Sequence, residues 1–176
     1  ELILAAHRAI LAQIPAMLLV LVPRHPERGP QIFNLLKKSG FSASMRSKNS
    51  DIRPDTQAYL ADTLGEMGLF FTLAPLVFMG ASFGDQGGHN PFEPAQLKTA
   101  ILHGPNVRNF QSDYDLLDDA GAAQQVDDAP SLAQAVIDLT GSTQVQQMQR
   151  AGLTLMAQKS GIRAAVLNHL RPILPR

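Results

Sequence analysis

Basic side chains gather in the turn that follows the first long apolar run of the sequence. Arg24 and Arg28 are four residues apart, and His25 lies between them. A guanidinium group offers paired N–H donors to a phosphate or carboxylate, and a helix start adds free backbone N–H groups. This turn therefore predicts an anion-binding site. The alternative is that Arg28 pairs with a surface acid and that His25 only caps the helix.

A second polar turn follows a later apolar run, at residues 62–66. Thr63 and Glu66 have the spacing of a capping box, in which a hydroxyl and a carboxylate bind free N–H groups at a helix start. That pattern accounts for both side chains without a ligand. Gly65 is unexpected there, because glycine weakens a helix, and a ligand that approaches the backbone closely would explain it.

The third turn, residues 80–94, is rich in glycine and leads into another helix start. Its glycines are Gly80, Gly84, Gly87 and Gly88. We expect Asn90 to be the N-cap of the helix, Pro91 its first residue and Glu93 a residue of its first turn. Glu93 either caps the helix or accepts hydrogen bonds from ribose hydroxyls. The sequence contains neither a Walker pattern nor G-x-G-x-x-G, so it does not support ATP hydrolysis or a standard dinucleotide site.

The composition is that of a globular domain without a global charge. The chain has 176 residues, of which 45% are hydrophobic and 17% charged, with 15 basic and 15 acidic side chains. This balance argues against nucleic acid as a partner, and the lack of Cys excludes disulfides and thiol nucleophiles. The apolar run at 16–23 is too short to span a bilayer. Because the chain starts at Glu1 within an apolar helical pattern, we interpret it as a piece of a longer protein.

Short apolar runs alternate with helical periods along the chain, a pattern typical of an α/β fold. We expect strands at 16–22, 41–46, 56–61, 76–79, 99–102 and 122–126, and helices at 1–13, 26–38, 64–73, 90–97, 109–120, 131–139 and 143–169. Strand followed by helix, repeated several times, predicts a Rossmann-like, mostly parallel sheet with helices on both faces. Ligands of such sheets bind beyond the carboxyl ends of the strands, where the three turns lie.

Four sequence strings resemble one known family. They are VPRHPER (22–28), DTLGEM (62–67), GGHNPFEPA (87–95) and HGPNVRNF (103–110), and they look like the C-terminal half of 3-deoxy-D-manno-octulosonic acid (Kdo) transferases. The resemblance runs from about residue 1 to residue 140, in the right order and with close spacing. It implies an inverting glycosyltransferase of the GT-B fold, which moves Kdo from CMP-Kdo to a lipid A precursor in lipopolysaccharide synthesis.

The resemblance also implies which residues meet the donor nucleotide. These are Pro23, Arg24, Leu64, Gly65, Glu66, Asn90, Pro91, Phe92 and Glu93, with His25 and Arg28 as further contacts to the phosphate or the Kdo carboxylate. The sequence departs from the family pattern at three positions, since Leu64 is commonly Met, Phe92 is commonly Leu, and Ala81 replaces a more usual Gly. The resemblance implies no bound metal and no cofactor.

Other parts of the transferase are expected outside this sequence. The resemblance implies a donor-nucleotide domain over 1–140 and, over 141–176, a C-terminal helix that packs back on it or reaches toward a missing N-terminal half. The general base, a Glu, and the membrane anchor would lie in that half, at the cytoplasmic face of the bacterial inner membrane. The chain by itself is then expected to be soluble and inactive. The alternatives are a half of a UDP-sugar transferase or nucleotide-sugar epimerase, or a non-catalytic Rossmann-like binding module.

The remaining polar residues have simpler interpretations. His7, His103 and His169 each stand without a second His or an acid at ligand spacing, so we expect structural roles.

The final helix carries one apolar stripe, made of Val145, Met148, Gly152, Leu155, Met156, Lys159, Ile162, Val166 and Leu170. Its basic residues, which include Arg150, Arg163, Arg171 and Arg176, either face anionic lipid or form a solvated surface.

Overall fold

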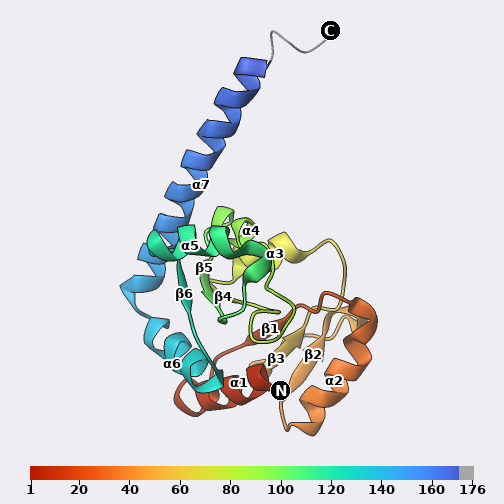
Figure 1. Ribbon diagram of the computed structural model, residues 1–176. Coiled ribbons are helices and arrows are strands. Elements are labelled where there is room, and N and C mark those ends of the chain that lie inside the picture. The colour runs from red at the N-terminus through yellow and green to blue at the C-terminus, as the bar shows by residue number, and fades with distance from the viewer. Residues whose placement is uncertain (171–176) are drawn as a thin grey trace. The chain divides into compact units, whose positions relative to one another are not determined.

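The computed structural model describes residues 1–170, with side chains described up to residue 160. The chain forms two compact units. Unit 1 comprises Glu1–Leu73 and Asp127–Gly141, and unit 2 comprises Ala74–Val126 and the chain from Ser142 onward. Each unit contains its own parallel sheet (Figure 1). In the described part of the chain, no helix is both long enough and apolar enough to span a membrane.

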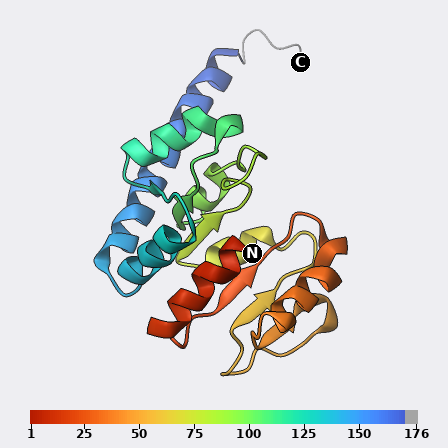
Figure 2. The same ribbon diagram turned by 60° about the horizontal axis from the view of Figure 1, so that its bottom comes forward.

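Unit 1 is built on three parallel strands in the order β1-β3-β2. They are β1 (Leu19–Leu21), β2 (Ala43–Met45) and β3 (Ala58–Leu60). Helix α2 (Gly29–Lys38) lies across this sheet, as Figure 2 shows in orange, and buries Leu36 completely in the core of the unit. Helices α1 (Leu2–Gln13) and α6 (Ala129–Leu139) pack against each other. The short α3 (Met67–Leu73) completes the unit.

Unit 2 has the strand order β4-β5-β6, again entirely parallel. Its strands are β4 (Leu76–Met79), β5 (Ala100–His103) and β6 (Ala123–Gln125). Its helices are α4 (Phe92–Gln96), α5 (Gln111–Asp119) and α7 (Thr143–Leu170). The core gathers around fully buried Ile101, Tyr114 and Leu117. Parallel strands place their carboxyl ends at one edge of a sheet, so the turns after β4 and β5 begin at the same edge.

The expected order of strands and helices is confirmed, although five helices, α2 to α6, begin two or three residues away from their expected starts. The segment 26–38 begins as a 3-10 turn (Pro26–Arg28) before α2. Helix α3 begins at Met67 and α4 at Phe92, whereas the sequence predicted starts at 64 and 90. Both differences arise because the residues just before these helices use their polar groups in turns. The expected division at residue 140 stays a prediction.

The apolar stripe of the final helix is confirmed where side chains are described. Met148 and Met156 are buried in unit 2, and Gly152 faces Ala95 of α4, where α7 and α4 pack against each other. Lys159 is not free, because its ammonium lies 4.2 Å from the centroid of the Phe92 ring and 4.0 Å from Asp113. The stripe positions Ile162, Val166 and Leu170 and the basic residues Arg163, Arg171 and Arg176 lie outside the side chains described.

Candidate nucleotide-binding turns

The basic turn after β1 is exposed and largely unpartnered. The guanidinium groups of Arg24 and Arg28 have no hydrogen bond or ion pair with any residue whose side chain is described. His25 makes no capping bond, and its Nδ1 lies 3.2 Å from Oε1 of Glu27. Arg28 therefore does not pair with a surface acid among the described residues, and the His25 side chain does not cap the helix, so this alternative is wrong. Two guanidinium groups are left available to an anion at the carboxyl edge of the unit 1 sheet.

Glu66 is held by a partner from a different turn. Arg46, the residue after β2, donates two hydrogen bonds to its carboxylate, from Nε at 3.1 Å and from Nη2 at 2.6 Å. The Thr63 hydroxyl also donates to this carboxylate. The hydrogen bonds from Arg46 and then from Thr63 lower the pKa of Glu66 from 4.5 to about 2. Glu66 is therefore ionised at neutral pH.

The capping box predicted for Thr63 and Glu66 is wrong. Helix α3 begins only at Met67, and the two side chains bind each other and Arg46 instead of N–H groups of the helix start. Gly65 has a φ of +83°, a left-handed conformation that glycine adopts without strain, so the turn itself explains this residue. Beside it, the Leu64 side chain is 80% exposed and free to contact a ligand.

The second acid, Glu93, has different surroundings. It lies in the first turn of α4, as predicted, with an exposed side chain that has no hydrogen-bond partner among the described residues. Its interpretation as a capping carboxylate is therefore wrong, and its oxygens remain available as acceptors. Asn90 does stabilise the helix start, because its Oδ1 accepts from the Phe92 N–H at 2.9 Å, while Pro91 rather than Asn90 is the N-cap.

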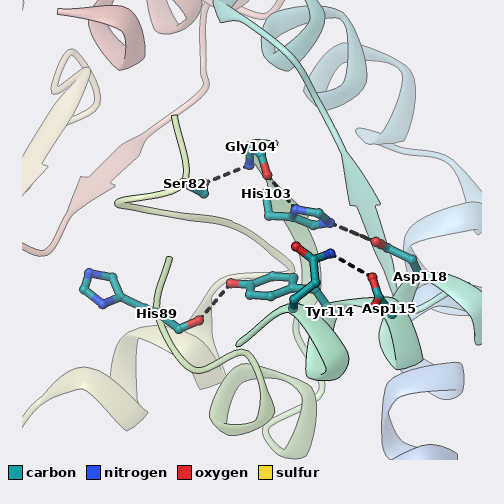
Figure 3. Close-up of polar contacts among 8 residues, drawn as sticks. Ser82, His89, His103, Gly104, Tyr114, Asp115 and Asp118 are labelled. Atoms are coloured by element: carbon teal, nitrogen blue, oxygen red, sulfur yellow. Dashed lines mark hydrogen bonds and ion pairs between the residues drawn. The ribbon is translucent and has the colours of Figure 1, made fainter. Parts of the chain in front are cut away.

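The glycine-rich turn is anchored at both ends by buried polar groups (Figure 3). At its start, the Ser82 hydroxyl donates to the Met79 carbonyl at 2.6 Å and accepts from the Gly104 N–H at 2.8 Å. Near its end, the hydroxyl of fully buried Tyr114 donates to the His89 carbonyl at 2.9 Å. Burial, and then the nearby Asp118 carboxylate, raise the pKa of this hydroxyl, so it remains a donor.

The buried histidines have structural positions. His103, 1% exposed, contacts the Gly104 carbonyl through Nδ1 and the Asp118 carboxylate through Nε2 at 3.1 Å, an acid that the sequence did not reveal as its neighbour. Burial lowers the pKa of His7, and a hydrogen bond with the Gln57 carbonyl opposes part of this effect. His169 lies outside the side chains described. Among the described residues, no group of three His, Asp or Glu side chains could hold a metal ion.

The sequence missed two features of these turns. The first is Arg46, which belongs with Glu66 because β2 and β3 are paired and their carboxyl ends are adjacent. The signal was available, since a charged residue at the end of a predicted parallel strand lies at the binding edge of the sheet. The second is the contact between the string HGPNVRNF (103–110) and the glycine-rich turn.

Known proteins similar to this chain decide its family. The 3-deoxy-D-manno-octulosonic acid transferase of Haemophilus influenzae is 36% identical over 178 aligned residues, which cover 100% of this chain and 42% of that protein. The transferase of Bordetella pertussis is 31% identical over 95% of this chain and 39% of its own length. The C-terminal CMP-Kdo binding domain of WaaA from Acinetobacter baumannii is similar in structure, with a TM-score of 0.73 and 32% identity, over 85% of this chain and 80% of that domain.

The chain belongs to the Kdo transferase family. The predicted fold, the C-terminal half of a GT-B glycosyltransferase, is confirmed by the likeness to the Acinetobacter domain. Family membership also sets aside the UDP-sugar transferase and epimerase alternatives. The chain spans less than half the length of the curated relatives it matches. No family model matches the chain.

Proposed function

We propose that this chain is the donor-binding domain of a Kdo transferase and binds the CMP part of CMP-Kdo. The observation that carries the proposal is the turn after β1, where the exposed side chains of Arg24 and Arg28 have no partner in the described part of the chain. The donor brings one phosphate and one sugar carboxylate, both anionic, and such groups are bound well by guanidinium forks. The likeness to a solved CMP-Kdo binding domain supports the same ligand.

Each of the two units contributes some of the proposed donor contacts. In unit 1 they are Pro23, Arg24, Leu64, Gly65 and Glu66, with His25 and Arg28 as further contacts to the carboxylate or phosphate. In unit 2 they are Asn90, Pro91, Phe92 and Glu93. The unpartnered carboxylate of Glu93 suits ribose hydroxyls, which need an acceptor. The Phe92 ring packs against the core of unit 2. This residue therefore fixes the start of α4, beside which Asn90, Pro91 and Glu93 lie.

Transfer itself is a property that we infer for the longer protein. The acceptor would be a lipid A precursor, the general base would come from outside this sequence, and the reaction would take place at the cytoplasmic face of the inner membrane. The name Kdo transferase, which both relatives carry, supports the transfer of Kdo, and these relatives are more than twice as long as this chain. The chain alone is expected to bind the donor nucleotide and to transfer nothing.

Isothermal titration of the chain with CMP and with UMP tests the proposal. We expect CMP to bind more tightly, and Arg24→Ala to weaken CMP binding by about tenfold, since hydrogen bonds to charged groups are worth about 1.5–3 kcal/mol. Arg53→Ala is the matched control, because Arg53 is also exposed but pairs with Asp55. Neither variant should change the melting temperature, since exposed Arg side chains contribute little stability. Preference for UMP, or loss of stability without loss of binding in Arg24→Ala, would contradict the proposal.

A further inference from the structure

The segment 103–110 lies along the glycine-rich loop 80–88 and binds it through the backbone at several points. The Asn106 N–H donates to the Ser82 carbonyl at 2.9 Å, and the Asn109 N–H donates to the Gly87 carbonyl at 3.1 Å. Gly104 has no room for a side chain, because a Cβ there would collide with the Ser82 carbonyl oxygen. The two stretches of chain are therefore in direct contact from the start of the loop to its end.

Three side chains of this segment bind three successive carbonyl groups of the loop. Asn106 Nδ2 donates to the Gly84 carbonyl at 2.8 Å. Arg108 Nη2 donates to the Asp85 carbonyl at 2.5 Å. Asn109 Nδ2 donates to the Gln86 carbonyl at 2.8 Å. Two amide groups and one guanidinium group thus hold the exposed tip of the loop, which has no regular secondary structure of its own to fix it.

This pattern determines where the N–H groups of the loop point. In a trans peptide the N–H lies opposite the C=O, and none of the described residues has a cis peptide bond. With the carbonyls of residues 84–86 turned toward segment 103–110, the N–H groups of Asp85, Gln86 and Gly87 point away from it. None of these three N–H groups has an acceptor among the described residues. Asp85 and Gln86 are exposed, so the loop offers their N–H groups as unused donors on its open side, whereas Gly87 is buried.

We propose that Asn106, Arg108 and Asn109 are positioning residues, which fix this loop so that its outward N–H groups bind the phosphate of the donor nucleotide. The inference rests on the proposed function, because it assumes that CMP is the ligand. Successive N–H groups on one side of a turn form a concavity that favours anions. A loop that is already fixed loses less conformational freedom on binding, so the three side chains increase affinity without touching the ligand.

The test is a double variant, Asn106→Ala with Asn109→Ala, which removes two neutral donors and leaves every charge in place. Its matched control is Asn34→Ala, at an exposed position of α2. The first measurement is hydrogen exchange of the Gly88 amide, which donates to the Ala81 carbonyl at 2.9 Å and closes the loop. We expect this amide to exchange about thirtyfold faster in the double variant, because two hydrogen bonds that stabilise the closed loop are lost.

The second measurement is calorimetric binding of CMP and of cytidine, which lacks the phosphate. The double variant should bind CMP about tenfold more weakly and cytidine with nearly unchanged affinity, whereas Asn34→Ala should match the original chain for both. Unchanged CMP binding, or equal losses for CMP and cytidine, would overturn the positioning role while leaving the proposed function intact. If the unaltered chain binds no CMP, the proposed function fails and this inference fails with it.

Discussion

The turn after β3 and the turn after β4 are held in two different ways. Around Glu66, in unit 1, the contacts join side chains, since the carboxylate binds Arg46 and Thr63. In the glycine-rich loop of unit 2, the acceptors are backbone carbonyls, bound by side chains and N–H groups of segment 103–110. The first arrangement depends on a pair of opposite charges, and the second depends mainly on the course of the backbone.

This difference predicts different sensitivities. A charge pair at the surface weakens when salt screens it or when the acid is protonated. Hydrogen bonds to backbone carbonyls do not titrate, so the loop of unit 2 should keep its shape over a wide pH range. Substitutions that alter side-chain charge should therefore disturb the turn of Glu66 more, and substitutions that alter backbone conformation should act on both turns.

The largest effect is expected from Arg46→Met, which removes the cation and keeps much of the side-chain volume. The pKa of Glu66 should rise from about 2 toward 4.5, because its strongest hydrogen bonds are lost. The folded chain lowers this pKa, so the pair stabilises the fold fully above pH 4.5 and loses that contribution as the pH falls toward 2. Stability of the variant should therefore depend less on pH across that window.

An NMR titration of the Glu66 carboxyl carbon, combined with urea unfolding at several pH values, measures both effects. Arg53→Met is the control, since its pair with Asp55 is exposed and its N···O distance is longer, at 3.6 Å. That control should leave the titration of Glu66 unchanged. A Glu66 that still titrates near pH 2 in Arg46→Met would show that Thr63 or the backbone holds the acid, and the contrast between the two turns would disappear.

Sequence reasoning captured the elements and missed the contacts between turns. Local signals were sufficient to predict the strands and helices, because apolar periodicity and the positions of Gly and Pro can be recognised within a short stretch of sequence. The capping-box interpretation of Thr63 and Glu66 failed because Arg46, 20 residues earlier in the chain, competes for the same carboxylate. Such a partner depends on which strands are neighbours in the sheet, and the pattern of one turn does not contain that information.

A smaller effect is expected from Gly65→Ala, which tests the backbone of the turn after β3. With a φ of +83° and nothing within 4 Å of an added Cβ, the substitution causes no collision and only forces Ala into the left-handed region. We expect a loss of about 1 kcal/mol in the free energy of unfolding. Gly80→Ala is the matched control after β4, because its Cβ also meets open space and its φ is not left-handed. Equal losses in both variants, measured by urea unfolding, would show that conformation is not the cause.

The smallest effect is expected from Ala81→Gly, in the glycine-rich loop. Ala81 has a φ of +63°, although most residues with a side chain avoid this region, and it stands where the family pattern commonly has glycine. Its carbonyl accepts the Gly88 N–H, so the contacts of the loop hold it in this conformation. Glycine removes the strain but adds freedom to the unfolded chain, so we expect a net gain of about 0.5 kcal/mol.

Urea unfolding of Ala81→Gly and of Ala120→Gly separates the strain at Ala81 from the added freedom of the unfolded chain. Ala120 is exposed and has an ordinary φ of −77°, so its replacement should lose about 0.5–1 kcal/mol through unfolded-state freedom alone. The difference between the two variants then measures the strain at Ala81. A loss in Ala81→Gly as large as that in the control would mean that the left-handed conformation of Ala81 carries no strain.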